Sequence, residues 1–124
     1  MTKRERLPDE RQSITHKFTV ADQEGYITAG LFEDGRLGEV FANIAKEGST
    51  VSGLTDCLFI VTSVALQYGV PLEVLARKLK NTRFEPYGLT QNKDIPEASS
   101  LVDYIFRWLE AKFVKGKEEE APHG

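Results

Sequence analysis

The sequence contains one cysteine, Cys57, and two histidines, His16 and His123, among its 124 residues. A single cysteine excludes an intrachain disulfide framework and any zinc site built from cysteines alone. Two histidines leave a mixed cysteine and histidine metal cluster short of ligands. No nucleophile and base stand at a recognisable spacing. We therefore expect no catalytic residues and no bound metal in this chain.

The sequence also lacks an excess of positive charge and a long uninterrupted apolar run. Sixteen Lys and Arg residues against nineteen Asp and Glu residues give a net charge of −3, which argues against nucleic-acid binding. The longest apolar stretch, 50–68, carries Asp56, and its uninterrupted part, 57–61, is far shorter than the ~20 residues of a membrane span. The charged N-terminus does not resemble a signal peptide. We expect a cytoplasmic protein without membrane association.

Composition and periodicity indicate one globular domain, with 40% hydrophobic and 28% charged residues. We expect a charged leader at 1–12, a folded domain at 13–114 and a disordered polar tail at 115–124. Alternation over 14–20 predicts a half-buried strand. Runs at 26–32 and 38–44 predict two more strands, and the Asp34-Gly35 pair between them predicts a hairpin. Gly30, inside a strand, indicates a bulge or a close neighbouring backbone.

The second half of the chain has helical periodicity. A helix that begins at 48–50 and ends near Gly69 is apolar almost all round, which predicts a helix buried on most sides. A second helix is expected at 72–79, a long loop at 81–96 and a third helix at 97–113, with a capping box at Ser100–Asp103 if that helix begins later. The expected fold is α+β: a small antiparallel sheet of about three strands packed on a buried central helix, plus two further helices.

One segment, 46–53, has the composition of an anion site. A strand that leads through glycine into a helix start leaves backbone N–H groups free to bind a phosphate or carboxylate. The candidate residues for binding an anion or nucleotide are Lys46, Gly48, Ser49 and Thr50. The alternative, which common residue preferences favour, is that Ser49 or Thr50 only caps the helix.

Other chemically notable residues have structural explanations. Cys57 is expected to be an inert thiol in the core, and His16 a hydrogen-bonded core imidazole. Asp56 lies among apolar residues, where a buried carboxylate needs a partner; pairing with Arg83 or Arg107 would explain it as well as a catalytic role would. Asp103 and Arg107 have the spacing of an ordinary helical ion pair.

Six blocks of sequence, in order and without large gaps, resemble one known domain. They are LPDERQSITHKF (7–18), EGYITAGLFEDG (24–35), AKEGSTVSGL (45–54), ALQYGVPLEVL (65–75), TRFEPYGLT (82–90) and DYIFRWL (103–109). Together they resemble the C-terminal domain of adenosylcobalamin (vitamin B12)-dependent, class II, ribonucleotide reductases. That domain belongs to a family named after a Thr-Ser-Cys-Pro-Asp motif.

The resemblance implies a role in deoxyribonucleotide synthesis for DNA replication, but not the reaction itself. The catalytic barrel, the cysteine-rich redox tail and the Thr-Ser-Cys-Pro-Asp motif have no counterpart here. The resemblance thus implies a stand-alone or split accessory module that binds no cofactor itself and docks on a reductase catalytic subunit. The elements expected to dock are the sheet and the aromatic loop, with Arg83, Phe84 and Tyr87 as the docking residues. The alternatives left open are an independent nucleotide-binding or phosphate-binding module, which would use Lys46–Thr50, and self-association. A small hydrolase or redox enzyme ranks last, because no nucleophile and base pair is recognisable.

Overall fold

A computed structural model describes residues 3–115 of the chain. The strands are β1 (Ser13–Val20), β2 (Gln23–Leu31), β3 (Leu37–Ile44), β4 (Gly88–Leu89) and β5 (Glu97–Ala98). The helices are α1 (Ser49–Gln67), α2 (Leu72–Leu79), α3 (Leu101–Glu110) and the short π-helical segment η1 (Ala111–Lys115). The α+β fold class, with a three-stranded sheet and three helices, is confirmed. The tail predicted at 115–124 lies outside the described residues except for Lys115.

The main sheet is an antiparallel meander in the order β1-β2-β3. Gly35 closes the predicted β2–β3 hairpin with a φ of 90°, a conformation that glycine adopts without strain. The register shifts between Gly30 and Leu31, where Gly38 of β3 is the extra residue, so the irregularity predicted at Gly30 is a bulge in the opposite strand. One face of the sheet is apolar and packs against α3, where the Phe18 and Tyr104 rings stack at 4.8 Å.

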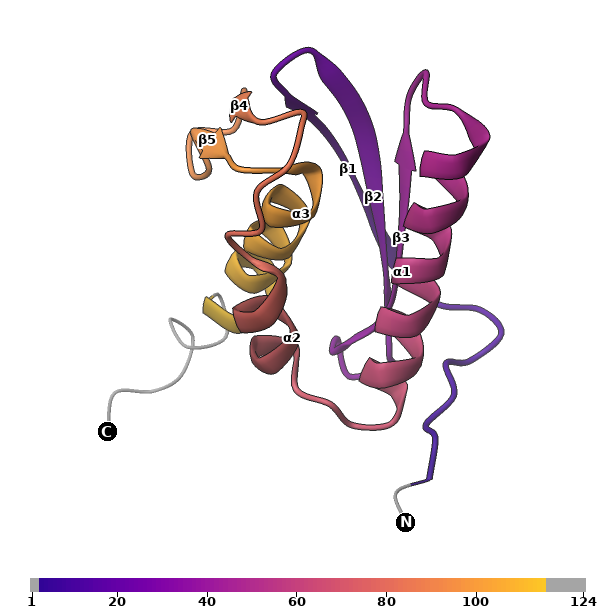
Figure 1. Cartoon of the computed structure of the whole chain (residues 1–124). Helices are drawn as coiled ribbons and strands as arrows, with labels where there is room; N and C mark the ends of the chain where they lie inside the picture. The colour runs from indigo at the N-terminus through magenta and orange to yellow at the C-terminus, as the bar shows by residue number, and fades with distance from the viewer. Residues whose placement is uncertain (1–2, 116–124) are drawn as a thin grey trace, which may run out of the picture.

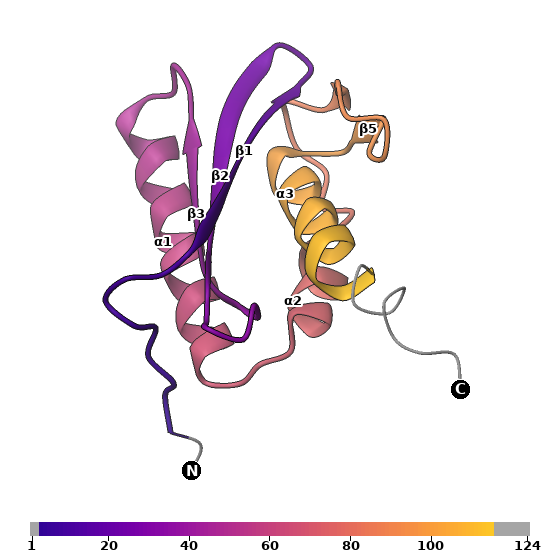
Figure 2. The ribbon, with the colours of Figure 1, turned by 180° about the vertical axis from the view of Figure 1, so that it is seen from behind.

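Helix α1 lies beside β3 and continues the row of strands at its edge (Figures 1 and 2). The Ser63 Oγ accepts a hydrogen bond from Val40 N at 2.9 Å and donates to Val40 O at 3.2 Å. Gln67 Nε2 donates to Gly38 O at 2.9 Å. The helix therefore satisfies backbone groups of β3 that an edge strand would leave open. Only Phe59, Thr62, Ser63 and Gln67 of α1 are buried, so the prediction of a helix buried on most sides is wrong.

The most buried helix is α3, which contributes Tyr104, Ile105, Phe106, Trp108 and Leu109 to the core. It begins at Leu101, because Ser100 Oγ accepts a hydrogen bond from Asp103 N at 2.9 Å. The predicted start at 97 is wrong, since residues 97–98 form β5, and the alternative with a later start and a cap at Ser100 is confirmed. Ring stacking between Phe59 and Phe106 joins α1 to α3 across the core.

The segment before β1 is attached to the domain along its described length. Glu5 N donates to Gln67 O at 2.8 Å, and Arg4 Nε donates to Gln67 Oε1 at the same distance. Arg11 forms an ion pair with Glu39. These contacts hold the N-terminal segment against the C-terminal end of α1 and the β2–β3 hairpin.

Replacing Ser63 with alanine should destabilise the domain. The change removes both hydrogen-bond partners of Val40 in a buried place, which costs about 1–3 kcal/mol of unfolding free energy. Urea unfolding followed by circular dichroism measures the loss. Ser52→Ala, at an exposed position of the same helix, makes the same change in helix propensity and should alter stability by no more than about 0.5 kcal/mol. Equal effects of the two substitutions would contradict the pairing of α1 with β3.

Candidate docking surface

The outward side of α1 is apolar and open to solvent. We call it the outer α1 surface, made of Leu54, Cys57, Ile60, Val61 and Tyr68, all of them exposed. Leu54 and Val61 each expose 67% of their surface and Ile60 exposes 54%. A helix that is apolar all round is normally covered on all sides. Large contiguous apolar patches on a protein surface mark interaction sites, whereas single exposed apolar residues do not.

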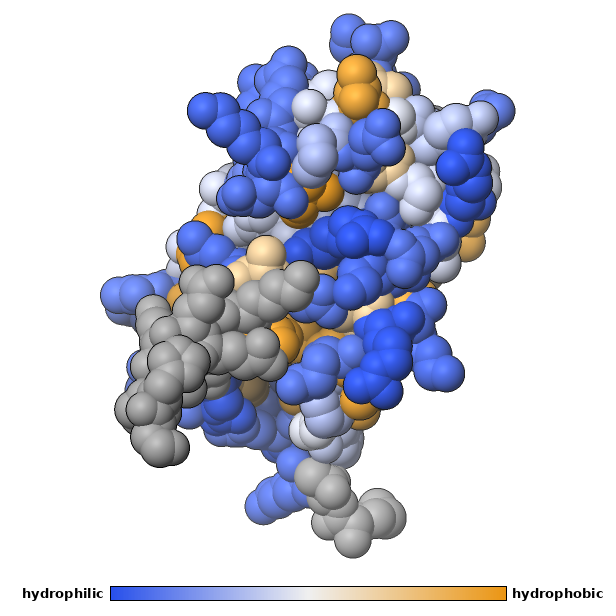
Figure 3. All heavy atoms as spheres, turned by 90° about the vertical axis from the view of Figure 1, so that its left-hand side faces the viewer, coloured by the Kyte–Doolittle hydropathy of each residue, from blue (hydrophilic) through white to orange (hydrophobic). Residues whose placement is uncertain are grey.

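Two features distinguish this surface from the side of the molecule that carries α3 and β5. Asp56 is the only charged residue in the nineteen of α1. The side of the molecule that carries α3 and β5 is chiefly hydrophilic, with apolar residues in small separate patches (Figure 3). Among the described helices, α1 is also the one that is long and apolar enough to cross a membrane by length and composition, a test that core helices of globular domains also pass.

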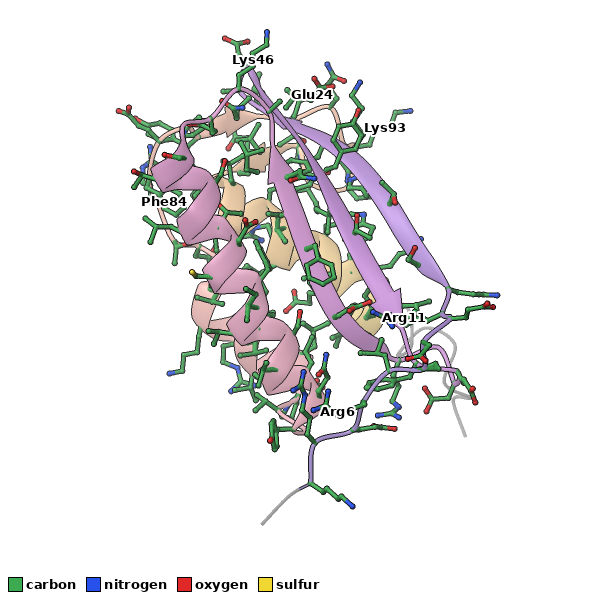
Figure 4. All side chains as sticks on the ribbon, turned by 90° about the vertical axis from the view of Figure 1, so that its right-hand side faces the viewer. Arg6, Arg11, Glu24, Lys46, Phe84 and Lys93 are labelled. Carbon is green, nitrogen blue, oxygen red and sulfur yellow. The ribbon has the colours of Figure 1, made fainter. Side chains whose placement is uncertain are left out.

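An apolar groove adjoins the outer α1 surface. We call it the α1–α3 groove; it has a volume of about 360 Å³. Its walls are apolar side chains of the two helices and of the 84–86 loop: Val51, Leu54, Leu58, Phe59, Leu101, Val102, Ile105, Phe84 and Pro86. Phe84 lies beside the N-terminal half of α1 (Figure 4). Glu47 and Glu85 are its charged lining residues.

The docking residues expected from the sequence lie on the loop that borders this groove. Arg83, Phe84 and Tyr87 are all exposed. The Arg83 guanidinium lies 4.1 Å from the centre of the Tyr87 ring, a cation–π contact. Phe84 N donates to Ser99 O at 3.1 Å, which fixes the backbone while the Phe84 ring remains 45% exposed. The structure thus brings Phe84 to an apolar groove; a docking role for the three residues stays a prediction.

Asp103 holds this loop in place. Its carboxylate is buried and accepts hydrogen bonds from Asn81 N at 2.6 Å, Ser99 N at 2.9 Å and Arg107 Nε at 2.9 Å. Burial alone would raise the pKa of Asp103, but the two backbone donors and the Arg107 charge together lower it. The sequence predicted an ordinary helical pair with Arg107 and missed that Asp103 also joins the two ends of segment 81–99.

At the predicted anion site, the structure shows an open helix start. Gly48 is the N-cap residue, and no side chain caps α1, so the expectation that Ser49 or Thr50 caps the helix is wrong. Ser49 and Thr50 follow the N-cap position by one and two residues. They therefore lie inside the first turn of the helix, and both are exposed. Lys46 has a φ of 60° and lies at the end of the sheet where β3 leads into α1 (Figure 4). Anion binding by these residues stays a prediction.

Two other sequence interpretations fail because α1 is exposed. Cys57 is at the surface and not in the core. Asp56 is exposed and has no ion pair within the described part of the chain, whereas Arg107 pairs with Asp103. Both residues are exposed, so water solvates them and the carboxylate needs no partner.

The interpretation of His16 as a hydrogen-bonded imidazole is confirmed, but the residue is half-buried and is not part of the buried core. Its Nε2 lies 2.8 Å from the Tyr104 hydroxyl, which also accepts from Asn92 Nδ2 at 3.0 Å, and the ring stacks on Trp108. Burial, together with the charge of Lys112, lowers the pKa of His16, so its ring is neutral at pH 7. Residues 3–115 contain no group of three or more side chains that could hold a metal ion.

Comparison with known proteins places this sequence in a family. The family model of the TSCPD domain matches residues 2–113. The chain belongs to the TSCPD domain family. The chain is 57% identical over 116 residues to the vitamin B12-dependent ribonucleotide reductase of Rhodopirellula baltica and 52% identical over 111 residues to that of Streptantibioticus cattleyicolor. It is 42% identical over 112 residues to the same enzyme of Agrobacterium fabrum. No solved structure matches the chain.

The TSCPD domain accounts for a small part of these relatives. The alignments cover 94%, 90% and 90% of this chain, but only 11%, 18% and 9% of the three reductases. The resemblance inferred from the six sequence blocks is thereby confirmed at the level of the domain. In these relatives, the equivalent of this domain is part of a much larger protein.

Replacing Asp103 with asparagine should destabilise the TSCPD domain by about 2–4 kcal/mol at pH 7, because a buried charge that accepts three hydrogen bonds is lost. Folding lowers the pKa of Asp103 below its value in the unfolded chain, which is near 3.9. The stability that the charged carboxylate contributes is therefore present above that pH and is lost as the pH falls through the pKa of the folded state. The stability difference between the two proteins should therefore shrink below about pH 4. Urea unfolding between pH 2.5 and 7 tests this, with exposed Asp56→Asn as the control; a difference that does not change with pH would contradict it.

Substitutions at Gly48 test the open helix start of the TSCPD domain. Gly48 has a φ of −70°, which any residue adopts, and an added Cβ would meet nothing within 4 Å. Aspartate should accept from the first-turn N–H groups and raise the unfolding free energy by about 0.5–1 kcal/mol. Gly48→Ala offers no acceptor and should lower stability instead. If thermal unfolding shifts in the same direction for both variants, the helix start is not open.

Proposed function

We propose that this TSCPD domain is a non-catalytic docking domain of a vitamin B12-dependent ribonucleotide reductase, and that its outer α1 surface binds the catalytic part of that enzyme. The observation that carries the proposal is the exposed apolar side of α1. Leu54 and Val61 would be costly to leave in water in a stable domain without a partner. The larger reductases that share this domain supply such a partner.

The titratable groups of the described residues support a docking role over catalysis. His16 is held between Tyr104 and Trp108, and Asp103 is saturated with structural donors. We accordingly assign the adenosylcobalamin and the chemistry of the family to the catalytic part. The proposal places the domain in deoxyribonucleotide synthesis for DNA replication and, with it, in the cytoplasm, without contact with nucleic acid or membrane.

Nucleotide or phosphate binding at Lys46–Thr50 is the second candidate function. The uncapped first turn of α1, which contains no acidic residue, favours it. Glu47, which precedes the N-cap residue Gly48 in sequence, weighs against it because a negative charge near the helix start repels an anion. The docking function therefore has the stronger support.

A binding experiment tests the docking function. The chain is mixed with the Rhodopirellula baltica reductase from which the matching segment has been removed, and association is measured by sedimentation velocity. We expect a complex, and we expect Val61→Glu to weaken it at least tenfold, because a charge would be buried in an apolar contact. Val74→Glu, at an exposed apolar position of α2, is the matched control and should bind like the unchanged chain.

Two outcomes would overturn this function. One is the absence of any complex at concentrations where both proteins are folded. The other is self-association of the chain that Val61→Glu abolishes while no complex with the reductase forms; a second copy would then be the partner. Cys57, the only cysteine of the chain, gives an independent readout: its alkylation rate, followed by mass spectrometry of the peptide, should fall in the complex.

A further inference from the structure

The α1–α3 groove combines an apolar interior with an acidic rim. Its volume of about 360 Å³ is near the lower end of the range for binding sites, ~300–1,000 Å³, and is enough for a few apolar side chains. Phe84 and Pro86 line the groove together with side chains of the N-terminal half of α1 and of α3. Because its lining is predominantly aliphatic and aromatic, burial of apolar side chains would supply most of the binding energy.

The charged residues that line the groove favour an occupant of one charge over the other. Glu47 and Glu85 are the charged residues that line the groove, and both are negative. Within residues 3–115, neither forms an ion pair. Arg83, the arginine nearest to Glu85 in sequence, instead stacks on the ring of Tyr87. Two unpaired carboxylates beside an apolar groove favour an occupant with a positive charge next to its apolar side chains, and disfavour an acidic one.

We propose that the α1–α3 groove binds a peptide segment that carries two or three apolar side chains flanked by lysine or arginine. This inference deepens the proposed function, on which it rests: the segment belongs to the catalytic part of the reductase. Its apolar side chains enter between Val51, Leu58 and Val102, and its basic residue pairs with Glu47 or Glu85. The outer α1 surface then adds apolar contact area next to this anchor, and the groove determines which segment is accepted.

The fixed position of Phe84 supports recognition rather than non-specific contact. The hydrogen bond from Phe84 N to Ser99 O and the links from Asp103 to Asn81 and Ser99 hold the loop backbone before any partner arrives. A wall that is already in place loses little conformational freedom on binding, which favours affinity for the matching segment.

Overlapping 15-residue peptides that cover the Rhodopirellula baltica reductase outside the matched region identify the segment. Each peptide is titrated against the fluorescently labelled full chain. We expect the peptides that bind to combine apolar and basic residues and to bind more weakly at high salt. The double variant E47K/E85K should weaken them at least tenfold. D94K/E97K, which reverses two exposed acidic residues near β5, makes the same change of net charge and should have no effect.

The outcomes separate this inference from the docking function. Binding of acidic or purely apolar peptides, equal effects of the two charge-reversed variants, or no peptide binding at all would overturn the groove inference. If the reductase without its matching segment still binds the chain, and V61E weakens it while E47K/E85K does not, the docking function stands and the groove is not its anchor. If that reductase does not bind, the docking function fails, and the inference that rests on it falls as well.

Discussion

The edge of β3 is the constraint on which the rest of the structure depends. A strand at the edge of a sheet presents backbone N–H and C=O groups that need partners once they are buried. In this domain a helix supplies the partners through two side chains, Ser63 and Gln67, at a spacing of one helical turn. The helix must therefore lie beside the sheet, along its edge. Only the stripe of α1 that faces β3 and the core is covered, and its opposite side is open.

This arrangement separates the polar chemical groups of the domain from its exposed apolar surfaces. The carboxylate of Asp103, the imidazole of His16 and the hydroxyl of Tyr104 are engaged with one another or with the backbone inside the domain. The exposed features are apolar side chains and rim carboxylates. A domain with that distribution of groups is suited to association, in agreement with its occurrence within much larger reductases.

The sequence predicted where the helices and strands lie along the chain better than it predicted how deeply each of them is buried. Alternation along 14–20 and the Asp34-Gly35 turn report directly on strand and hairpin geometry, which are local, and both were confirmed. The burial of α1 is not local: apolar periodicity shows that a helix prefers to be covered, but not whether the covering residues belong to the same chain. The same limit explains Cys57 and Asp56, which lie on the exposed part of α1; among the apolar residues of that helix, Phe59 is the one that is fully buried in the core. The Asp103 network was missed because it joins backbone groups 22 and 4 residues away in sequence.

The hydrogen bonds of Asp103 also affect how segment 81–99 opens locally in the folded domain. By binding both Asn81 N and Ser99 N, one carboxylate closes segment 81–99 into a ring anchored on the first turn of α3. Opening either end leaves a buried charge with fewer donors, so the two ends are coupled energetically. Backbone amides such as those of Asn81, Phe84 and Ser99 should therefore exchange with solvent as one cooperative unit, at a rate separate from that of the β1–β2–β3 sheet.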